Sequence, residues 1–388
     1  MDTNIGSSGL RPDRELHNTC QVRVIARAGS WIEGEALQQL DRVAERYGMR
    51  LAVGLPDLHP GRGHPIGAAF LTERAVYPAL VDNDIGCGMA LWQTQLPAHF
   101  RDFDRWEKRL SALDRPLDES ALSDVAPALL EAGHVHSLGT IGGGNHFAEL
   151  QRVSEVHDQA AFDALGLSKK GLLLLVHSGS RGLGEAVLRA HVREHGDKPL
   201  MSDTWELRNY LGKHDVAVEW ARANRRLIAQ RFMLAVRTKG EPVLDLVHNS
   251  VIVQDPARHR FLHRKGAAPA DGGAVVIPGS RGAESHLVMP TARAAQTDAS
   301  AFSLAHGAGR RWKRSECKDR LREHWSADEL TRTALGSRVV CGDRELLFEE
   351  APQAYKDVDG VVGDLVAHGL VTQIATLQPV LTFKTSKG

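Results

Sequence analysis

Apolar positions recur with helical spacing in three segments of the chain. Residues 35–47 place apolar side chains on one face, and residues 122–132 form a shorter segment of the same kind. The longest pattern lies within residues 203–236, where apolar side chains follow the three-and-four spacing of a buried helical face. Asn224 falls within that face, and we expect it to be a core polar group held by hydrogen bonds. The pattern therefore predicts three helices.

Elsewhere, short apolar runs end at glycine-rich or polar turns. The five runs are residues 79–81, 172–176, 243–247, 275–277 and 302–305. Strands hold side chains rigidly, and the turns after them let backbone approach a ligand. Five such ends predict one site built from many strand termini. The sequence contains no internal repeat and no long Pro/Ser-rich linker, so residues 1–388 are expected to form a single domain.

The overall composition is that of a globular protein. Of the 388 residues, 42% are hydrophobic and 25% charged, and the formal net charge is zero. Any site for a polyanion must therefore be a local cluster of Lys and Arg. The four cysteines make no disulfide framework or C-x-x-C pair. No secretory signal or membrane-spanning run is expected, which favours the cytoplasm.

Five potential metal ligands lie at the strand ends. Asp84 and Cys87 share a glycine-bracketed turn, His146 follows three glycines, and His177 and His248 each end an apolar run. A carboxylate, a thiolate and three imidazoles suit a catalytic transition-metal centre, in which the sulfur could bridge two ions. Taken singly, each histidine could be a core or turn residue, the cysteine a small apolar residue and Asp84 a turn former. Together they favour a metal site.

Two glycine-rich loops are candidates for phosphate chemistry. The loop from Gly139 to Glu149 exposes consecutive backbone N–H groups that could hold a phosphate, although it matches neither the Walker A nor the G-x-G-x-x-G pattern and could be a plain turn. In the segment from His306 to Arg310, a neutral imidazole is a competent nucleophile toward phosphorus. A sixth metal ligand, a general base and a structural residue remain alternative roles for His306.

Nine motifs in this chain, spread from about Leu55 to Lys384, together resemble the RtcB family of RNA ligases. They are PDLHPGRGHPIG, DNDIGCGM, GTIGGGNHFAE, HSGSRGLG, VHNS, HRKGA, PGSRGAES, HGAGR and EEAPQAYKDVD. The resemblance implies an α+β, single-domain fold, with mixed or antiparallel sheets flanked by helices around a central metal-containing cleft. It also implies that two Mn²⁺ ions are bound by Asp84, Cys87, His146, His177 and His248, with Cys87 bridging.

The resemblance further implies that His306 attacks the α-phosphate of GTP and holds GMP. The guanylate would pass to an RNA 3′-phosphate, and an RNA 5′-hydroxyl would then displace GMP. A 2′,3′-cyclic phosphate would first be opened to the 3′-phosphate at the same centre. The implied RNA-phosphate contacts are Arg181, Lys265, Arg310 and Arg314. The implied GTP or GMP contacts are Asn145, His146, Phe147, Glu149, His248, Asn249, Pro278, Gly279, Ser280, Arg281, Ser285, His306, Gly307, Ala308, Gly309, Tyr355 and Lys384.

The chain departs from the family pattern at several points. Lys384 aligns with the guanine-contacting lysine by spacing, with Lys387 as the alternative; Arg281 and Lys313 replace uncharged residues; and residues 95–132 are abbreviated. The motif wording resembles a bacterial branch associated with a release-factor-like protein and ribosomal RNA repair. The sequence leaves open the RNA, the metal used in the cell, the need for an activating protein, and the oligomeric state, for which a monomer is the default.

Two rival functions use the same residues. A dinuclear phosphohydrolase would employ His306 as a base, and a degenerate RNA-end-binding protein would no longer form a guanylate. A hydrolase has no use for a guanine pocket, and a degenerate binder would be expected to lose some of the five ligands or His306. The ligase is therefore the preferred hypothesis.

Overall fold

A computed structural model describes residues 20–294 and 297–386. The alternative lysine, Lys387, and the N-terminal residues 1–19 lie outside these ranges. No described helix has the length and apolarity needed to cross a membrane.

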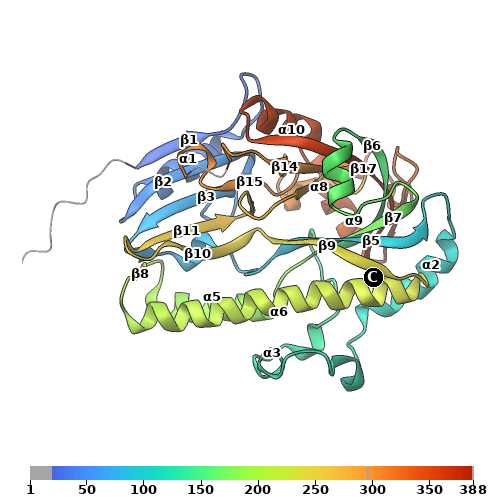
Figure 1. Ribbon diagram of the computed structural model, residues 1–388, viewed down its shortest axis with the longest axis horizontal. Helices are drawn as coiled ribbons and strands as arrows, with labels where there is room; N and C mark the ends of the chain where they lie inside the picture. Colours follow the sequence, from blue (N-terminus) through green and yellow to red (C-terminus); the bar gives the residue numbers. More distant parts are fainter. Residues whose placement is uncertain (1–19, 295–296, 387–388) are drawn as a thin grey trace, which may run out of the picture.

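Two large sheets form the centre of the fold (Figure 1). The first has the strand order β1 (Gln21–Val24), β2 (Met49–His59), β3 (Ile66–Glu73), β11 (Arg260–Lys265) and β10 (Asn249–Asp255). The second has the order β13 (Val275–Pro278), β14 (Ser285–Pro290), β17 (Val371–Thr385), β6 (Phe147–Val156), β7 (Gly171–Ser178), β5 (Gly88–Pro97) and β9 (Gly240–Val247). Within these sheets all pairs are antiparallel except β1–β2 and the pairing of β16 (Arg338–Cys341) with β17. Two further described pairs join β12 (Ala267–Pro269) to β15 (Ser303–Ala305) and β4 (Ala75–Val76) to β8 (Leu200–Met201).

Helices flank the sheets, and the longest, α6 (Trp205–Ala235), runs along one side of the molecule (Figure 1). The other α-helices described are α1 (Gly34–Ala44), α2 (Phe103–Leu110), α3 (Pro127–Glu131), α4 (Gln159–Ala164), α5 (Gly182–His195), α7 (Thr297–Ser300), α8 (Arg314–Leu321), α9 (Arg344–Glu349) and α10 (Val358–Ala367). Short 3₁₀ helices occupy Pro78–Leu80, Ser111–Asp114, Glu119–Leu122, Val135–Ser137, Glu329–Thr331 and Pro352–Ala354. The predicted α+β class with mixed, mainly antiparallel sheets and flanking helices is confirmed.

Two of the three predicted helices are confirmed. The stripe in residues 203–236 becomes α6, whose start is capped by the Thr204 hydroxyl accepting from the Leu207 amide, and residues 35–47 give α1. The helix predicted for residues 122–132 was wrong in extent, because only Pro127–Glu131 is α-helical. Pro127 cannot continue a helix from the preceding residues, since it has no amide hydrogen and disfavours helical geometry in the residue before it.

Four of the five predicted strand runs are confirmed. Three lie within β7, β9 and β13, and the run at 302–305 becomes β15, which begins one residue later. The run at residues 79–81 was wrong as a strand, because Pro78 starts a 3₁₀ helix there. The register of the second sheet has a direct consequence for the site. Gly88, at the start of β5, pairs with Ser178 at the end of β7 and with Val247 at the end of β9. Residues next to these three positions therefore meet at one sheet edge.

Candidate metal and nucleotide site

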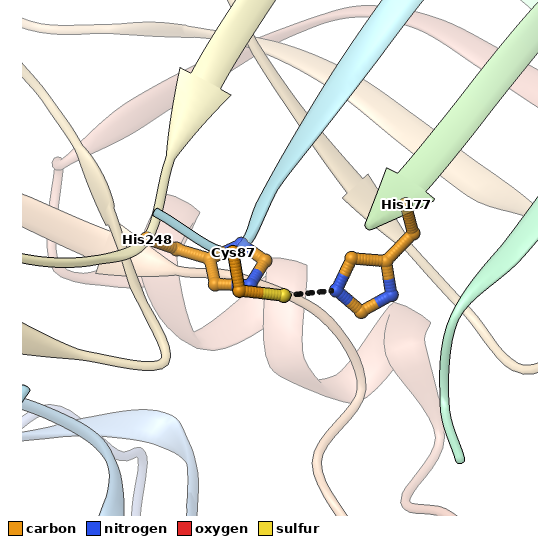
Figure 2. A group of neighbouring side chains, drawn as sticks. All are labelled: Cys87, His177 and His248. Atoms are coloured by element: carbon orange, nitrogen blue, oxygen red, sulfur yellow. Dashed lines mark hydrogen bonds between the residues drawn. The ribbon is translucent and has the colours of Figure 1, made fainter. Parts of the chain in front are cut away.

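Cys87, His177 and His248 meet at this edge of the second sheet. Cys87 directly precedes β5, His177 is near the end of β7, and His248 directly follows β9. Figure 2 shows the three side chains converging, and their potential ligand atoms all lie within 4.8 Å of one another. The Cys87 Sγ atom is 3.2 Å from His177 Nε2.

Asp84, Cys87 and His146 form a second group with the same mutual spacing, within 4.8 Å. His146 Nε2 lies 2.8 Å from Asp84 Oδ2 and 3.4 Å from Cys87 Sγ. Cys87 thus belongs to both groups, so one sulfur lies between two sets of nitrogen and oxygen donors. The structure brings together all five predicted metal ligands. This donor set, with a single thiolate among imidazoles and a carboxylate, fits two transition-metal ions sharing a sulfur.

Backbone carbonyls fix the ring orientation of two of these histidines. His146 Nδ1 is 3.1 Å from the Ile141 carbonyl, and His177 Nδ1 is 3.1 Å from the Asn145 carbonyl. A carbonyl can only accept, so Nδ1 carries the hydrogen and Nε2 keeps its lone pair for a metal. Burial, followed by the charges of neighbouring histidines, lowers the pKa of both His177 and His248 well below the usual value. Both imidazoles are therefore neutral, as metal ligands must be.

Two adjacent polar residues of α6 hold the backbone next to the candidate metal ligands. The Arg225 guanidinium is fully buried, binds Asp245, and donates from Nη1 to the carbonyls of Gly86 and Ser178 at 2.8 Å each. Asn224 accepts from the Gly139 amide at 2.8 Å and donates to Ser178 Oγ at 3.1 Å. The prediction that Asn224 is a hydrogen-bonded core residue is confirmed. Arg225 was not singled out from the sequence, yet it joins the residues next to Cys87 and His177.

His306 lies beside the metal ligands and is held by a buried carboxylate. Its ring packs against His248 with centroids 4.8 Å apart. Asp57 Oδ2 accepts from His306 Nδ1 at 2.6 Å and from the His306 amide at 3.1 Å, and Asp57 is fully buried. Because the carboxylate holds Nδ1, the His306 lone pair lies at Nε2. Gly309, with φ of +73°, allows the loop to pass so close that a Cβ there would lie 2.3 Å from the Asp57 carbonyl oxygen.

Sequence reasoning missed Asp57. The residue lies within the motif PDLHPGRGHPIG, and its signal is an acidic residue inside a strand, β2, whose residues are almost all buried. A buried carboxylate needs a partner. Its partner, His306, is 249 positions away in the sequence, so the pairing could be seen only in the fold.

A cavity of about 1430 Å³ opens over these groups. Its volume exceeds the range of about 300–1,000 Å³ common for small-molecule sites, so it has room for more than a nucleotide. All four predicted RNA-phosphate residues line it, as do the five metal ligands and His306. Every predicted nucleotide residue also lines it except Ser285, which lies behind the wall and accepts a 2.7 Å hydrogen bond from Gln151 Nε2.

A charged network forms one end of the cavity around Glu350. Arg310 Nη1 donates to Glu350 Oε1 and to the Tyr355 hydroxyl at 3.1 Å each, and its other nitrogens donate to backbone carbonyls and Cys317 Sγ. Although burial opposes it, Lys384, Arg310 and Arg314 lower the pKa of Glu350 to about 2. Arg310 is thus fully engaged within the protein, whereas the Arg314 side chain, 3.7 Å from Glu350, is nearly half exposed.

Glu149 is a second buried carboxylate in the cavity wall. Burial raises its pKa to about 7, against hydrogen bonds from Thr382 and Gln151 and the charge of Lys384. Arg281, which departs from the family pattern, is also buried and donates from Nη2 to the Leu347 carbonyl at 2.7 Å. Its Nε and Nη1 atoms have no hydrogen-bond partner among the described residues.

Comparison with known proteins decides the family. The family model described as tRNA-splicing ligase RtcB matches residues 39–121 and 117–385. The chain belongs to the RtcB family. The resemblance predicted from the nine motifs is therefore confirmed, and with it the assignment to a family of ligases.

Individual RtcB proteins are similar over most of their length. The chain is 50% identical to RNA-splicing ligase RtcB2 of Escherichia coli, covering 95% of this chain and 96% of the relative. It is 30% identical to tRNA-splicing ligase RtcB of Archaeoglobus fulgidus over 90% of this chain and 91% of the relative. It is 28% identical to RNA-splicing ligase RtcB of Mycobacterium tuberculosis over 86% of this chain and 96% of the relative. The Mycobacterium alignment spans 426 positions, more than this 388-residue chain contains, so that relative has segments this chain lacks.

Proposed function

We propose that this protein is a GTP- and Mn²⁺-dependent RNA ligase, which joins an RNA 3′-phosphate or 2′,3′-cyclic phosphate end to a 5′-hydroxyl end. The observation that carries the proposal is the position of His306, tethered by Asp57 through Nδ1 and packed on His248 of the metal cluster. A lone pair at Nε2, beside a donor set for two cations, suits attack on a phosphorus atom. The relatives named as RNA-splicing or tRNA-splicing ligases support RNA as the substrate.

In the first proposed step, His306 Nε2 attacks the α-phosphorus of GTP and pyrophosphate leaves, so that GMP becomes linked to the histidine. The bound metal ions, held by Asp84, Cys87, His146, His177 and His248, would neutralise phosphate charge. Asp57 accepts the hydrogen bond from Nδ1, so it orients the ring with Nε2 toward the nucleotide, and its charge stabilises the positive charge that develops on the ring. The glycine-rich loop before His146 offers backbone N–H groups to the phosphates.

In the second and third steps, an oxygen of the RNA 3′-phosphate attacks the guanylate phosphorus and releases His306. The 5′-hydroxyl of the other RNA end then attacks the 3′-phosphorus and expels GMP. Arg181, Lys265 and Arg314 line the cavity and would contact RNA phosphates there, with Lys265 oriented by Asp82, 3.6 Å away. Arg310, whose donors are already used, would act by positioning Tyr355 and Glu350.

We assign the guanine end of the nucleotide to the region of Glu149 and Lys384. Guanine offers ring N–H groups to an acceptor and a carbonyl oxygen to a donor, which a carboxylate and an ammonium group can satisfy. Lys384 lines the cavity and is only 3% exposed, which supports it as the guanine-contacting lysine. Ser280, Arg281 and Tyr355 line the same region.

Labelling with α-³²P-GTP in the presence of Mn²⁺ tests the proposal. We expect protein-bound label that is acid-labile and alkali-stable, as for a phosphoramidate, and that disappears in His306→Ala. His286→Ala is a matched control, because His286 is also a buried histidine paired with an aspartate, Asp359, but lies outside the cavity. Absence of label in the wild type would favour the rival phosphohydrolase or degenerate binder, and label that persists in His306→Ala would reassign the nucleophile.

Several further expectations remain part of this proposal. They are a single domain over residues 1–388, a monomer in the cytoplasm, no membrane partner, and a functional link to a release-factor-like protein in ribosomal RNA repair. The resemblance to that bacterial branch supports the link.

A further inference from the structure

Trp31 is a large apolar side chain that the fold leaves in solvent. Its exposed fraction is 50%, and it lies in the loop between β1 and α1. The loop lies ahead of residue 39, where the segments matched by the RtcB family model begin. The Trp31 ring is linked to the cavity through Arg311, which lines the cavity and lies over the ring, so an exposed aromatic face lies next to the binding cavity.

The loop that carries Trp31 is firmly anchored. Arg27 Nε forms a 2.6 Å ion pair with Asp364 Oδ1, and the Ser30 hydroxyl donates to the same oxygen at 2.8 Å. Asp364 is buried in α10, which lies on the same side of the molecule as β1 and α1 (Figure 1). A ring held in place before binding loses little conformational entropy when a ligand arrives.

Cationic groups flank the Trp31 ring and continue to the cavity. The Arg311 guanidinium carbon is 6.0 Å from the centroid of the Trp31 ring, and Lys356 Nζ is 5.6 Å from the same centroid. Lys356 Nζ is held there by donating to the carbonyls of Pro56 and Leu58. Among the described residues, the Arg311 side chain has no ion pair or hydrogen bond, and Arg311 lines the cavity. An aromatic face beside an unneutralised arginine is the combination that holds single-stranded nucleic acid.

The cations beside Trp31 differ in whether an acidic residue neutralises them. Arg311, Lys313 and Arg314 follow one another along the cavity rim. Glu35 pairs with Lys313 at 3.1 Å and Glu350 lies 3.7 Å from Arg314, so Arg311 is the one of these three cations without an ion pair among the described residues. A protein partner with an apolar surface would not use these cations, whereas RNA supplies both a flat base for Trp31 and phosphates for the arginines.

We propose that Trp31 and Arg311 form a stacking platform for a base of the RNA strand that enters the cavity, one or more nucleotides from the reacting end. This inference rests on the proposed RNA ligase function and adds to it a contact outside the segments matched by the family model. The Trp31 ring stacks on the base, and Arg311 moves from the ring to an adjacent phosphate.

Binding of a single-stranded oligouridylate with a 3′-phosphate to the Mn²⁺-loaded protein tests the platform. Replacing an aromatic group that stacks on one base weakens binding about five-fold or more, and we expect this for Trp31→Ala, with near-complete recovery in Trp31→Phe. Trp205→Ala is the matched control, because Trp205 is 66% exposed at the start of α6 and, among the described residues, has no cation over its ring, whereas Trp31 contacts the cavity-lining Arg311. Equal affinity for RNA in Trp31→Ala and wild type would overturn the proposal.

Two further readouts separate this platform from the ligase chemistry. Labelling of the protein by GTP should be unchanged in Trp31→Ala and Arg311→Ala, because neither residue is placed at the nucleotide. RNA binding by Arg311→Ala should show a shallower salt dependence, and RNA should quench the tryptophan fluorescence of the wild type more than that of Trp31→Phe. If GTP does not label the wild-type protein, the ligase proposal is refuted. If labelling is normal but the variants keep the wild-type salt dependence and fluorescence quenching, only the stacking platform is refuted.

Discussion

Replacing Asp57 with asparagine tests the proposed nucleophile most directly. In the wild type, one carboxylate oxygen accepts hydrogen bonds from both the ring Nδ1 and the amide of His306, at 2.6 and 3.1 Å. Asn has nearly the same shape but no charge, and it can present either an oxygen or an NH₂ group to the ring. Asp57 belongs to neither group of potential metal ligands, so the substitution should leave metal binding intact.

The expected effect follows from the strength of this contact. A hydrogen bond to a charged group contributes roughly 1.5–3 kcal/mol net, and the full burial of Asp57 places this contact at the upper part of that range. The carboxylate acts more strongly as positive charge develops on the ring during attack, so the loss falls on the transition state. A loss of about 2–3 kcal/mol lowers the rate of protein guanylylation roughly 30- to 150-fold.

The assay is single-turnover labelling with α-³²P-GTP at saturating Mn²⁺, with the bound metal measured in the same samples. Asp364→Asn is a suitable control, because Asp364 is similarly buried and accepts a 2.6 Å bond from Arg27, away from His306. We expect the rate to fall in Asp57→Asn and to be maintained in Asp364→Asn, with equal metal content. A wild-type labelling rate in Asp57→Asn would refute the reasoning, and so would a slow rate explained by lost metal.

Three further outcomes are expected. Cys87→Ala should lose metal and protein guanylylation together, because Cys87 belongs to both ligand groups; a variant with two tightly bound ions and normal labelling would contradict the shared sulfur. Burial raises the pKa of Glu149 from 4.5 to about 7, so between these pH values the folded protein keeps a proton on Glu149 that the unfolded chain has lost. The stabilising contribution of the protonated Glu149 is therefore fully present below about pH 4.5 and is lost as the pH rises through about 7. The difference in unfolding free energy between the wild type and Glu149→Gln should therefore decrease by about 3 kcal/mol at most between pH 4.5 and 7. Urea titrations in which this difference does not change with pH would contradict the raised pKa. RNA binding through about three phosphate contacts should weaken roughly 100-fold over a ten-fold rise in salt, and a flat dependence measured by anisotropy would count against Arg181, Lys265 and Arg314 as phosphate ligands.

The sequence predicted those features of the fold that follow from local patterns. The helix predicted from apolar residues spaced three and four apart is present as α6, because residues 205–235 contain no proline that would interrupt it. The apolar runs before His177 and His248 became β7 and β9 for the same local reason. Both errors lie at prolines, Pro78 and Pro127, where a ring that fixes φ and removes an amide outweighed the apolar pattern around it.

The gathering of the ligands could be anticipated only as a hypothesis, because it depends on strand order. His177 and His248 flank Cys87 because β5 lies between β7 and β9, a neighbour relation between strands that periodicity does not contain. Ser285 illustrates the converse. Its motif places it near the nucleotide, but its side chain points to Gln151 behind the cavity wall.

Arg225 shows why the residues that support such a site are hidden from sequence patterns. In α6 it occupies a position that periodicity assigns to the core, where a charged residue is costly unless it is paired and hydrogen-bonded. Its partners are the Asp245 carboxylate and the carbonyls of Gly86 and Ser178, which are 20, 139 and 47 positions away. One guanidinium therefore fixes the turn before Cys87 and the strand end after His177 relative to each other. The relative position of these two candidate ligands is thus set by a helix that contributes no ligand of its own. An arginine at a core position of a mainly apolar helical face is the sequence feature from which such support can be sought.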